Sequence, residues 1–192
     1  LDKSTIYYWR VRAANSCKSG EWSKISAFIT EALSCKTYTT GAQSVVLSSA
    51  GTPTAELTIN IADQGTISDL NIKLIKAEHA RLGDLVATLI SPTSKECLLW
   101  SKQCGTQQNI NVGLDDQSAS FFQCPINSGK VYRTQTSGGA QKLDIFNGDQ
   151  MQGTWKLKIS DTASGGGGKL QEMNVEICAN QTVESPVLVK NE

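Results

Sequence analysis

The sequence contains a single histidine, His79, and no two cysteines spaced as Cys-x-x-Cys. A zinc site would therefore have to collect thiolates that lie far apart in the chain, which argues against a structural zinc centre. Lysine and arginine together number 18, aspartate and glutamate also number 18, and the formal net charge is zero. Without an excess of positive charge, the chain is not expected to bind nucleic acid or an anionic membrane surface.

Long apolar runs are also missing from the sequence. A membrane-spanning helix needs about 18 or more consecutive apolar residues, so no membrane span is expected. The chain opens on Leu1-Asp2-Lys3, which lacks the basic start and apolar stretch of a secretory signal peptide. We therefore interpret the sequence as a piece of a longer precursor.

Hydrophobic residues recur with the period of a β-strand along most of the chain. Apolar and polar residues alternate in the segments 7–13, 57–61, 67–74, 155–159 and 173–177. The apolar segment 85–90 is typical of a central, buried strand. Clusters of Gly, Pro, Asn, Asp and Ser separate these segments, which predicts an all-β sandwich. The one helix that the sequence suggests is a short one over residues 116–122, with Asp115 or Asp116 as its N-cap.

Six cysteines are present: Cys17, Cys35, Cys97, Cys104, Cys124 and Cys178. An even number without metal-ligand spacing favours disulfides formed in an oxidising compartment over free buried thiols. Six cysteines allow 15 connectivities, and spacing alone does not select among them.

Residues 1–30 form a unit of their own. Leu1, Thr5 and Tyr7, the strand-like run to Ala13, and Trp22-Ser23 resemble the last two strands of a fibronectin type III domain. The resemblance implies that Tyr7 is the tyrosine that anchors the start of one strand. Because an isolated two-stranded hairpin is marginally stable in water, we expect it to pack on the main domain or to be completed by another chain. The alternative is that these residues are extra strands of a single domain.

The remaining chain resembles the P domain (P/Homo B) that follows the catalytic domain of kexin- and furin-like proprotein convertases. The segments that carry this resemblance are His79 with Gly83-Asp84-Leu85 and Ser91-Pro92, then Gly153-Thr154-Trp155 with its strand to Asp161, then Gly168-Lys169-Leu170 with Val175-Glu176-Ile177. An insertion with Cys104-Gly105, Asp115-Asp116 and Cys124-Pro125 is similar to the version found in secreted proteins of Bacteroidetes. There a fibronectin type III domain often precedes the P domain.

The resemblance implies a jelly-roll-like antiparallel β-sandwich. The domains expected are a partial fibronectin type III domain over 1–30, a linker over 31–34, a P domain over 35–179 and a linker over 180–192. The resemblance also implies a secreted or cell-surface protein in which this module is non-catalytic and supports the folding and stability of a protease domain of the same precursor. The parent would then be a secreted serine or metallo endopeptidase. The alternative is an adhesion or structural module that contacts neighbouring repeats of a large surface protein, with carbohydrate binding as a variant.

Four acidic residues at predicted strand ends or in loops are candidates for a Ca²⁺ site: Asp84, Asp115, Asp116 and Asp161. Calcium takes six to eight oxygen ligands, and it is plentiful outside cells. The competing interpretation is that each aspartate caps a turn or the end of an element, since aspartate often does so.

The order of the predicted strands suggests two disulfides. Cys104 with Cys124 would link the two ends of the insertion, and Cys35 with Cys178 would join the first and last strands if the sandwich closes on itself. Cys17 and Cys97 are then unassigned. Cys17 has its partner in the missing part of its domain, or it reaches Cys97.

No catalytic site is expected within this chain. His79 lacks an accompanying Gly-x-Ser-x-Gly elbow, so a structural histidine is favoured over a triad member. The run Gly165–Gly168 before Lys169 lacks the Ser or Thr and the following helix of a phosphate-binding loop. Trp22, Trp100 and Tyr132 are the candidates for an aromatic sugar-binding row, although packing within the fold is the favoured role for them.

Overall fold

The computed structural model describes residues 1–2, 5–30, 33–134 and 140–180. Within them the chain forms strands almost throughout, together with two short 3-10 helices, η1 and η3. The elements of the main domain are β3 (Leu33–Thr39), β4 (Val45–Leu47), β5 (Thr54–Ile61), β6 (Thr66–His79), η1 (Leu82–Asp84), β7 (Leu85–Ile90), β8 (Glu96–Ser101), β9 (Ile110–Leu114), β10 (Lys130–Tyr132), η3 (Leu143–Phe146), β11 (Gly153–Asp161) and β12 (Gly168–Asn180).

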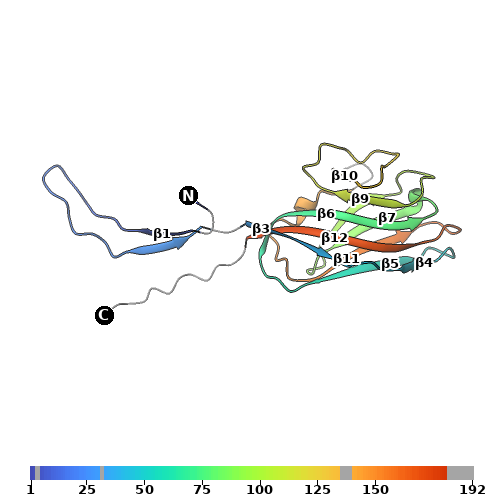
Figure 1. Cartoon of the computed structure of the whole chain (residues 1–192), viewed down its shortest axis with the longest axis horizontal. Coiled ribbons are helices and arrows are strands. Elements are labelled where there is room, and N and C mark those ends of the chain that lie inside the picture. Colours follow the sequence, from blue (N-terminus) through green and yellow to red (C-terminus); the bar gives the residue numbers. More distant parts are fainter. Residues whose placement is uncertain (3–4, 31–32, 135–139, 181–192) are drawn as a thin grey trace.

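The strands form two sheets that pack face to face (Figure 1). The larger sheet has the order β10-β9-β6-β12-β3, with β4 also paired to β12, and the smaller has the order β5-β11-β7-β8. All pairs in the smaller sheet are antiparallel, and in the larger sheet only β9 with β10 runs parallel. The predicted all-β, jelly-roll-like sandwich is confirmed, with β7 in the interior position that its apolar sequence indicates.

The core lies between the two sheets. It is formed by the inward-pointing residues of each strand, which alternate with residues that point outward. Residues of β5 are alternately exposed and buried along the whole strand, and β11 repeats the pattern. Trp155 of β11 is fully buried, packs edge to face on Phe146 with ring centroids 5.1 Å apart, and donates from Nε1 to the Met151 carbonyl at 2.9 Å. Its indole thus fills the core while its one polar atom is hydrogen-bonded, as a buried tryptophan requires.

The first and last strands of the sandwich are neighbours. Strand β3 pairs with the second half of β12, and β12 pairs with β6 along almost its full length. The edge strand β3 is also tied to the β5–β6 loop, where Asp63 accepts from Lys36 Nζ at 2.5 Å and Tyr38 Oη at 2.7 Å. Burial, followed by the bond to Asp63, raises the pKa of Tyr38, and the bonds from Lys36 and Tyr38 lower the pKa of Asp63.

Two local predictions differ from the structure. The helix expected over 116–122 is wrong: this segment contains a turn, a bend and an isolated β-bridge at Phe121. Asp115 Oδ1 accepts from the Gln117 amide at 2.6 Å to close the turn. An aspartate competes for nearby amides as readily in a turn as at a helix start. Leu33 and Ser34, predicted as linker, already belong to β3, and Asn180 ends β12. The rest of both predicted linkers, 31–32 and 181–192, lies outside the described residues.

A tight contact fixes the start of β11. Gly153 has φ +125°, and a Cβ placed on it would lie 2.6 Å from Cβ of Pro92. Pro92 stands in the turn after β7, as expected from its missing N–H. Only glycine adopts this backbone conformation and allows this approach.

The N-terminal hairpin consists of β1 (Ile6–Trp9) and β2 (Ser26–Ile29), paired antiparallel. Tyr7 stacks on Phe28, and the backbone amide of Asp2 donates to the Tyr7 hydroxyl at 2.6 Å. A hydrogen bond between this hydroxyl and the backbone a few residues upstream is typical of a tyrosine corner. Figure 1 shows the hairpin extending away from the sandwich rather than packing on it, so the first of the two expected arrangements is not seen.

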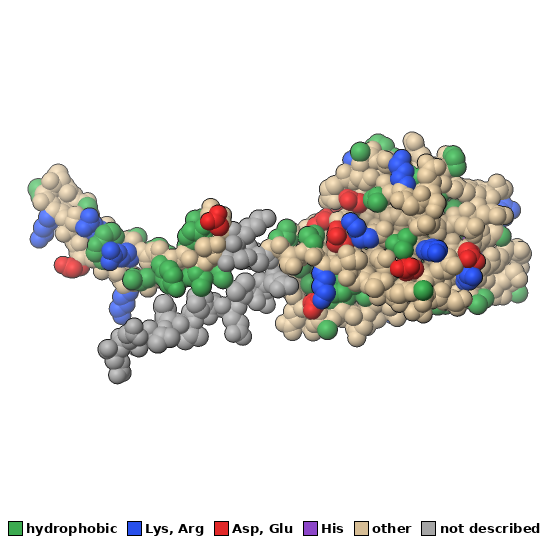
Figure 2. All heavy atoms as spheres, viewed as in Figure 1, with side chains coloured by type: hydrophobic (Ala, Val, Ile, Leu, Met, Phe, Trp, Pro, Cys, Tyr) green, Lys and Arg blue, Asp and Glu red, His purple; other side chains and the backbone are tan. Residues whose placement is uncertain are grey.

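The hairpin carries several exposed apolar side chains. Tyr8 is 65% exposed, and Trp9, Trp22 and Phe28 are each between 40% and 50% exposed. Figure 2 shows apolar side chains gathered along this part of the molecule. Since small soluble units rarely expose so many large apolar groups together, this hairpin has the surface of an incomplete sheet. Across the described residues, no helix has the length and apolar character needed to cross a membrane.

Candidate functional site

The single histidine forms a buried pair with an aspartate. His79, the last residue of β6, and Asp161, the last residue of β11, lie 3.0 Å apart between Nε2 and Oδ2, and both side chains are completely enclosed. The backbone of Arg81 lies against the other ring nitrogen, with its carbonyl 2.8 Å and its amide 3.1 Å from Nδ1. Both nitrogens are therefore in use, and the ring offers no free nitrogen to activate a nucleophile.

The pair joins the two sheets at one end of the sandwich. Asp161 Oδ1 accepts from the Ala163 amide at 3.0 Å. The Asp84 carbonyl accepts from Thr162 through both its amide and its hydroxyl, each at 2.8 Å. The carboxylate of Asp84 faces Arg81 at 3.7 Å. Two of the four predicted calcium residues, Asp84 and Asp161, thus lie in one neighbourhood. Their hydrogen bonds there hold backbone segments in place.

The other two, Asp115 and Asp116, follow β9. Besides closing the turn at Gln117, Asp115 donates its amide to the Tyr132 carbonyl at 2.9 Å. One oxygen of Asp116 accepts from the Thr134 hydroxyl, and the other accepts from the Asp144 amide at 2.9 Å. Both carboxylates therefore hold loops in place beside the larger sheet.

The structure does not bring the four aspartates together. Leu114, which precedes Asp115, pairs with Ile72, whereas His79 is seven residues further along β6. At a rise of about 3.3 Å per residue, the two pairs of aspartates are separated by roughly 20 Å along this strand. Within the described residues, no group of three or more His, Cys, Asp or Glu side chains is arranged to hold a metal ion. Asp115, Asp116 and Asp161 use carboxylate oxygens in these hydrogen bonds that a calcium ion would need.

Calcium binding by either pair of aspartates stays a prediction, and melting temperature tests it. If one pair holds calcium, EDTA should lower the melting temperature and added CaCl₂ should restore it, because a ligand that binds only the folded state stabilises it. Asp116→Asn and Asp84→Asn, compared in the same assay, identify which pair is responsible. A melting temperature that is identical in EDTA and CaCl₂, together with flat calorimetric titration, would contradict the prediction and leave the aspartates as turn caps.

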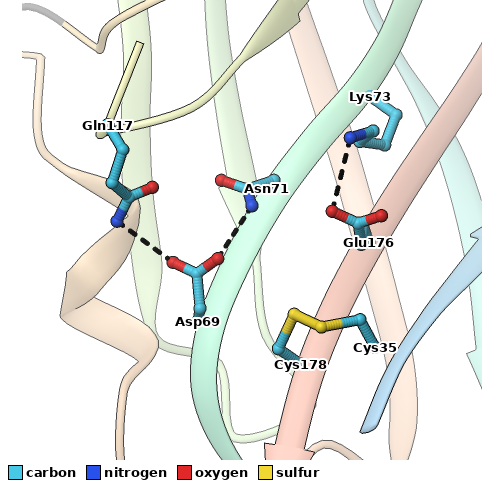
Figure 3. Close-up of a disulfide and its surroundings, with 7 residues drawn as sticks. All are labelled: Cys35, Asp69, Asn71, Lys73, Gln117, Glu176 and Cys178. Atoms are coloured by element: carbon cyan, nitrogen blue, oxygen red, sulfur yellow. Dashed lines mark hydrogen bonds and ion pairs between the residues drawn. A yellow bond between two sulfur atoms is a disulfide. The ribbon is translucent and has the colours of Figure 1, made fainter.

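Two disulfides are present among the described residues. Cys35 of β3 is bonded to Cys178 of β12, and Cys104 is bonded to Cys124. These are the two pairs that the strand order suggests. Figure 3 shows the first of them beside a polar cluster on the outer face of the larger sheet, in which Asp69 accepts from Asn71 at 2.8 Å and Gln117 at 3.3 Å. The disulfide and this cluster thus occupy the end of the sheet where β3 begins.

Cys17 and Cys97 are not joined to each other. Cys17 is exposed in the hairpin, and Cys97 is buried in the core. Burial, followed by the charges of Asp116 and Asp144, raises the pKa of Cys97 to about 12. The suggestion that Cys17 reaches Cys97 is therefore wrong, because one thiol points to solvent and the other is enclosed between the sheets.

The two free thiols are expected to react very differently with Ellman's reagent. At pH 8 Cys17 should react promptly, whereas Cys97 should react only in denaturant, because it is inaccessible and almost entirely protonated. Two fast-reacting thiols in the native protein would contradict the buried position of Cys97, and a Cys17→Ser variant identifies which signal is which.

The buried thiol also makes stability depend on pH. Folding raises the pKa of Cys97 from 9.0 to about 12. The contribution of this thiol to the free energy of unfolding, which is fully present below pH 9, should therefore decline as pH rises between these two values.

The aromatic residues do not form a sugar-binding row. Trp100 and Tyr132 are buried, and both lie in one cluster around Phe122, with ring centroids 6.2 Å and 5.5 Å from it. Only Trp22 is exposed, and Arg10 and Arg12 cover its ring at 4.3 Å and 4.5 Å. These three residues therefore do not line up as a platform for a sugar ring.

One groove of the sandwich was not predicted from the sequence. A groove of about 410 Å³ lies on the outer face of the larger sheet, lined by Lys76, Ala77, Glu78, Gln107, Gln108, Asn109, Ile110, Asn111, Val112, Ile126, Ser128 and Gln171. Its residues come from three strands and two loops, so only the folded arrangement brings them together. The sequence feature that indicates this groove is the high proportion of Asn and Gln in the segment 107–111.

The sandwich is similar to domains of known proteins. The family model described as the proprotein convertase P-domain matches residues 67–177, more than half of the chain. A curated relative, the Aeromonas extracellular serine protease of Aeromonas sobria, is 28% identical over 127 residues, which cover 66% of this chain and 18% of the relative. The chain thus spans about a fifth of the length of this relative.

Two solved structures are similar as well. The crystal structure of the serine protease of Aeromonas sobria matches 94% of this chain and 28% of its own, with a TM-score of 0.46 and 16% identity. The complex of that protease with a chaperone gives a TM-score of 0.44 and 16% identity over 95% of this chain and 28% of that one. From the family match, which takes in β6 to β12 together with His79, Asp161 and Trp155, the chain belongs to the proprotein convertase P-domain family.

Proposed function

We propose that this chain is a non-catalytic accessory module of a larger secreted protease, and that its folded sandwich supports the folding and stability of the protease domain. The observation that carries the proposal is the match of a P domain to about a fifth of an extracellular serine protease. Most of that relative lies outside the matched part, which leaves room for a catalytic domain. The enclosed pair of His79 and Asp161 fits a structural role, since neither His79 nitrogen is free.

The disulfides favour the same setting. Stable cross-links between strands are formed and kept in oxidising environments such as the exterior of the cell. A protease that works there is exposed to its own proteolysis, and a module that raises its stability protects it. We therefore place the parent protein outside the cell, and we propose that the partner of this module is the protease domain of the same precursor.

The hairpin supports a multidomain parent. Its tyrosine-corner hydrogen bond between Asp2 and Tyr7 and its exposed apolar side chains suit the closing strands of a fibronectin type III domain. We propose that residues 1–30 belong to such a domain and are completed by strands outside this chain. A hairpin completed by a neighbouring domain also fits the second candidate function, that of a structural module between neighbouring extracellular repeats.

Two deletions in the parent protein distinguish the candidates. Removing residues 33–180 should abolish secreted peptidase activity or reduce it at least tenfold, because the protease domain loses its supporting module. Removing residues 5–30 serves as the comparison and should have a smaller effect. If the parent has no peptidase activity, or if activity is unchanged without residues 33–180, the accessory role is refuted and the structural-module role is favoured.

A further inference from the structure

The groove on the outer face of the larger sheet has a fixed shape. Side chains of Lys76 and Glu78 from β6 stand on its floor, next to Asn111 of β9, which is directly opposite Lys76, and Gln171 of β12. The segments 107–109 and 126–128 form its walls. Because the floor belongs to three hydrogen-bonded strands, the groove exists before any ligand arrives, which reduces the cost of binding.

The walls are held together by their own bonds. The Gln107 amide group makes two hydrogen bonds with the Ile126 backbone, donating to its carbonyl at 2.7 Å and accepting from its amide at 2.9 Å. Asn111 Nδ2 donates to the Ser128 hydroxyl at 3.0 Å. The Cys104–Cys124 disulfide joins the two loops that contain these walls. These contacts keep the groove from collapsing and fix the orientation of the amides that line it.

Several polar groups in the groove remain available for a ligand. Gln171 Nε2 donates to Glu78, and Asn109 Oδ1 accepts from the His79 amide at 3.1 Å. The carbonyl oxygens of Gln171 and Asn111 and the Nδ2 of Asn109 make no bond within the described part of the chain, and the Gln108 side chain makes none there either. The groove therefore presents amide donors and amide acceptors at fixed positions.

The two charged side chains of the groove differ in their partners. Glu78 forms an ion pair with Lys169 at 3.2 Å. Glu172 of β12 is opposite Lys76 in the strand register, but it accepts a hydrogen bond from Asn174 Nδ2 at 3.1 Å, and Lys76 forms no ion pair among the described residues. Figure 2 shows acidic and basic side chains interspersed over the sandwich. On the larger sheet, for example, Lys73 pairs with Glu176 at 3.3 Å. The unpaired ammonium of Lys76 favours an acidic group on the ligand.

We propose that this groove binds an extended segment of polypeptide that carries an acidic side chain. An extended backbone offers alternating N–H and C=O groups, which match the amide acceptors and donors of Asn109, Asn111 and Gln171, while Lys76 takes the carboxylate. Sugar rings are commonly stacked on aromatic side chains, and the described lining residues include none. This binding function goes beyond an accessory role and does not depend on it.

Chemical-shift titration of the whole ¹⁵N-labelled chain tests the proposal. The probe is the capped hexapeptide Ac-Ala-Ser-Asp-Ala-Ser-Ala-NH₂, and a matched peptide with Lys in place of Asp is the control ligand. We expect saturable shifts at Gln108, Asn109, Asn111 and Gln171 with the acidic peptide and about fivefold weaker binding of the basic one, the effect of one exposed charge pair.

Two variants locate the site and leave the hydrogen bonds that hold its walls intact. Lys76→Met and Gln108→Ala alter side chains that form no hydrogen bond or ion pair among the described residues, and they should weaken binding of the acidic peptide about fivefold at unchanged melting temperature. Lys158→Met, on β11 of the other sheet, is the matched control and should bind normally. The proposal is overturned if no saturable shifts appear up to the solubility limit of the peptide, if both peptides bind equally, or if cellohexaose shifts the same signals and the peptides do not.

Discussion

Replacing Cys35 and Cys178 together by alanine is expected to lower the free energy of unfolding by about 5 kcal/mol in the chain-entropy model of disulfide stabilisation. The bond closes a loop of 143 residues between β3 and β12, so the unfolded chain is strongly constrained when it is present. For a domain of this size the loss corresponds to a fall of about 10–20 °C in melting temperature. Urea denaturation of the purified chain measures the change directly.

The second disulfide is the internal control. Cys104 and Cys124 are 20 residues apart, and the same model predicts a loss of about 3 kcal/mol when both are replaced by alanine. The larger loss should therefore come from the Cys35 and Cys178 variant. An equal or smaller loss for that variant would show that the bond between β3 and β12 does not lower the conformational entropy of the unfolded chain as the model requires.

Removal of one member of the buried His79 and Asp161 pair should be about as damaging. Asp161→Ala leaves the enclosed His79 without its partner, and His79→Ala leaves an enclosed carboxylate, so each should cost about 3–5 kcal/mol. Because both side chains are fully enclosed and 3.0 Å apart, the variant with both replaced should lose less than the sum of the two single losses.

Glu56→Gln serves as the control for this pair. Glu56 forms an ion pair with Lys156 at 3.7 Å on the smaller sheet, with both side chains more than 40% exposed. Such exposed pairs contribute at most about 1 kcal/mol. Losses that are strictly additive for His79 and Asp161, or no larger than that of Glu56→Gln, would mean that the pair is not a joint between the sheets.

Regular alternation made the central strands predictable. Segments 57–61, 85–90, 155–159 and 173–177 fall within β5, β7, β11 and β12. Strands β8 and β9 were not predicted, because the run Cys97-Leu98-Leu99-Trp100 is apolar on both faces and Gly113 interrupts the pattern of β9. Short edge strands such as β10 carry too few residues to show a period.

The candidate site was less predictable than the fold. His79 was read as structural, but its partner Asp161 is 82 residues away, and only the packing of the two sheets brings them together. The calcium hypothesis grouped four aspartates by type, whereas β6 separates them into two pairs. The groove depends on the register of β6, β9 and β12, which no local pattern in Lys76 or Asn111 reveals.

The central claim is that the folded sandwich supports a protease domain of the same precursor. We would measure secreted peptidase activity of the parent protein carrying Asp161→Ala, with Glu56→Gln as the control and limited proteolysis to report whether the sandwich is folded. The account predicts a destabilised sandwich that is cleaved faster by protease and at least a tenfold loss of activity with Asp161→Ala, and normal activity with Glu56→Gln. Full activity alongside a destabilised, readily cleaved sandwich would contradict it.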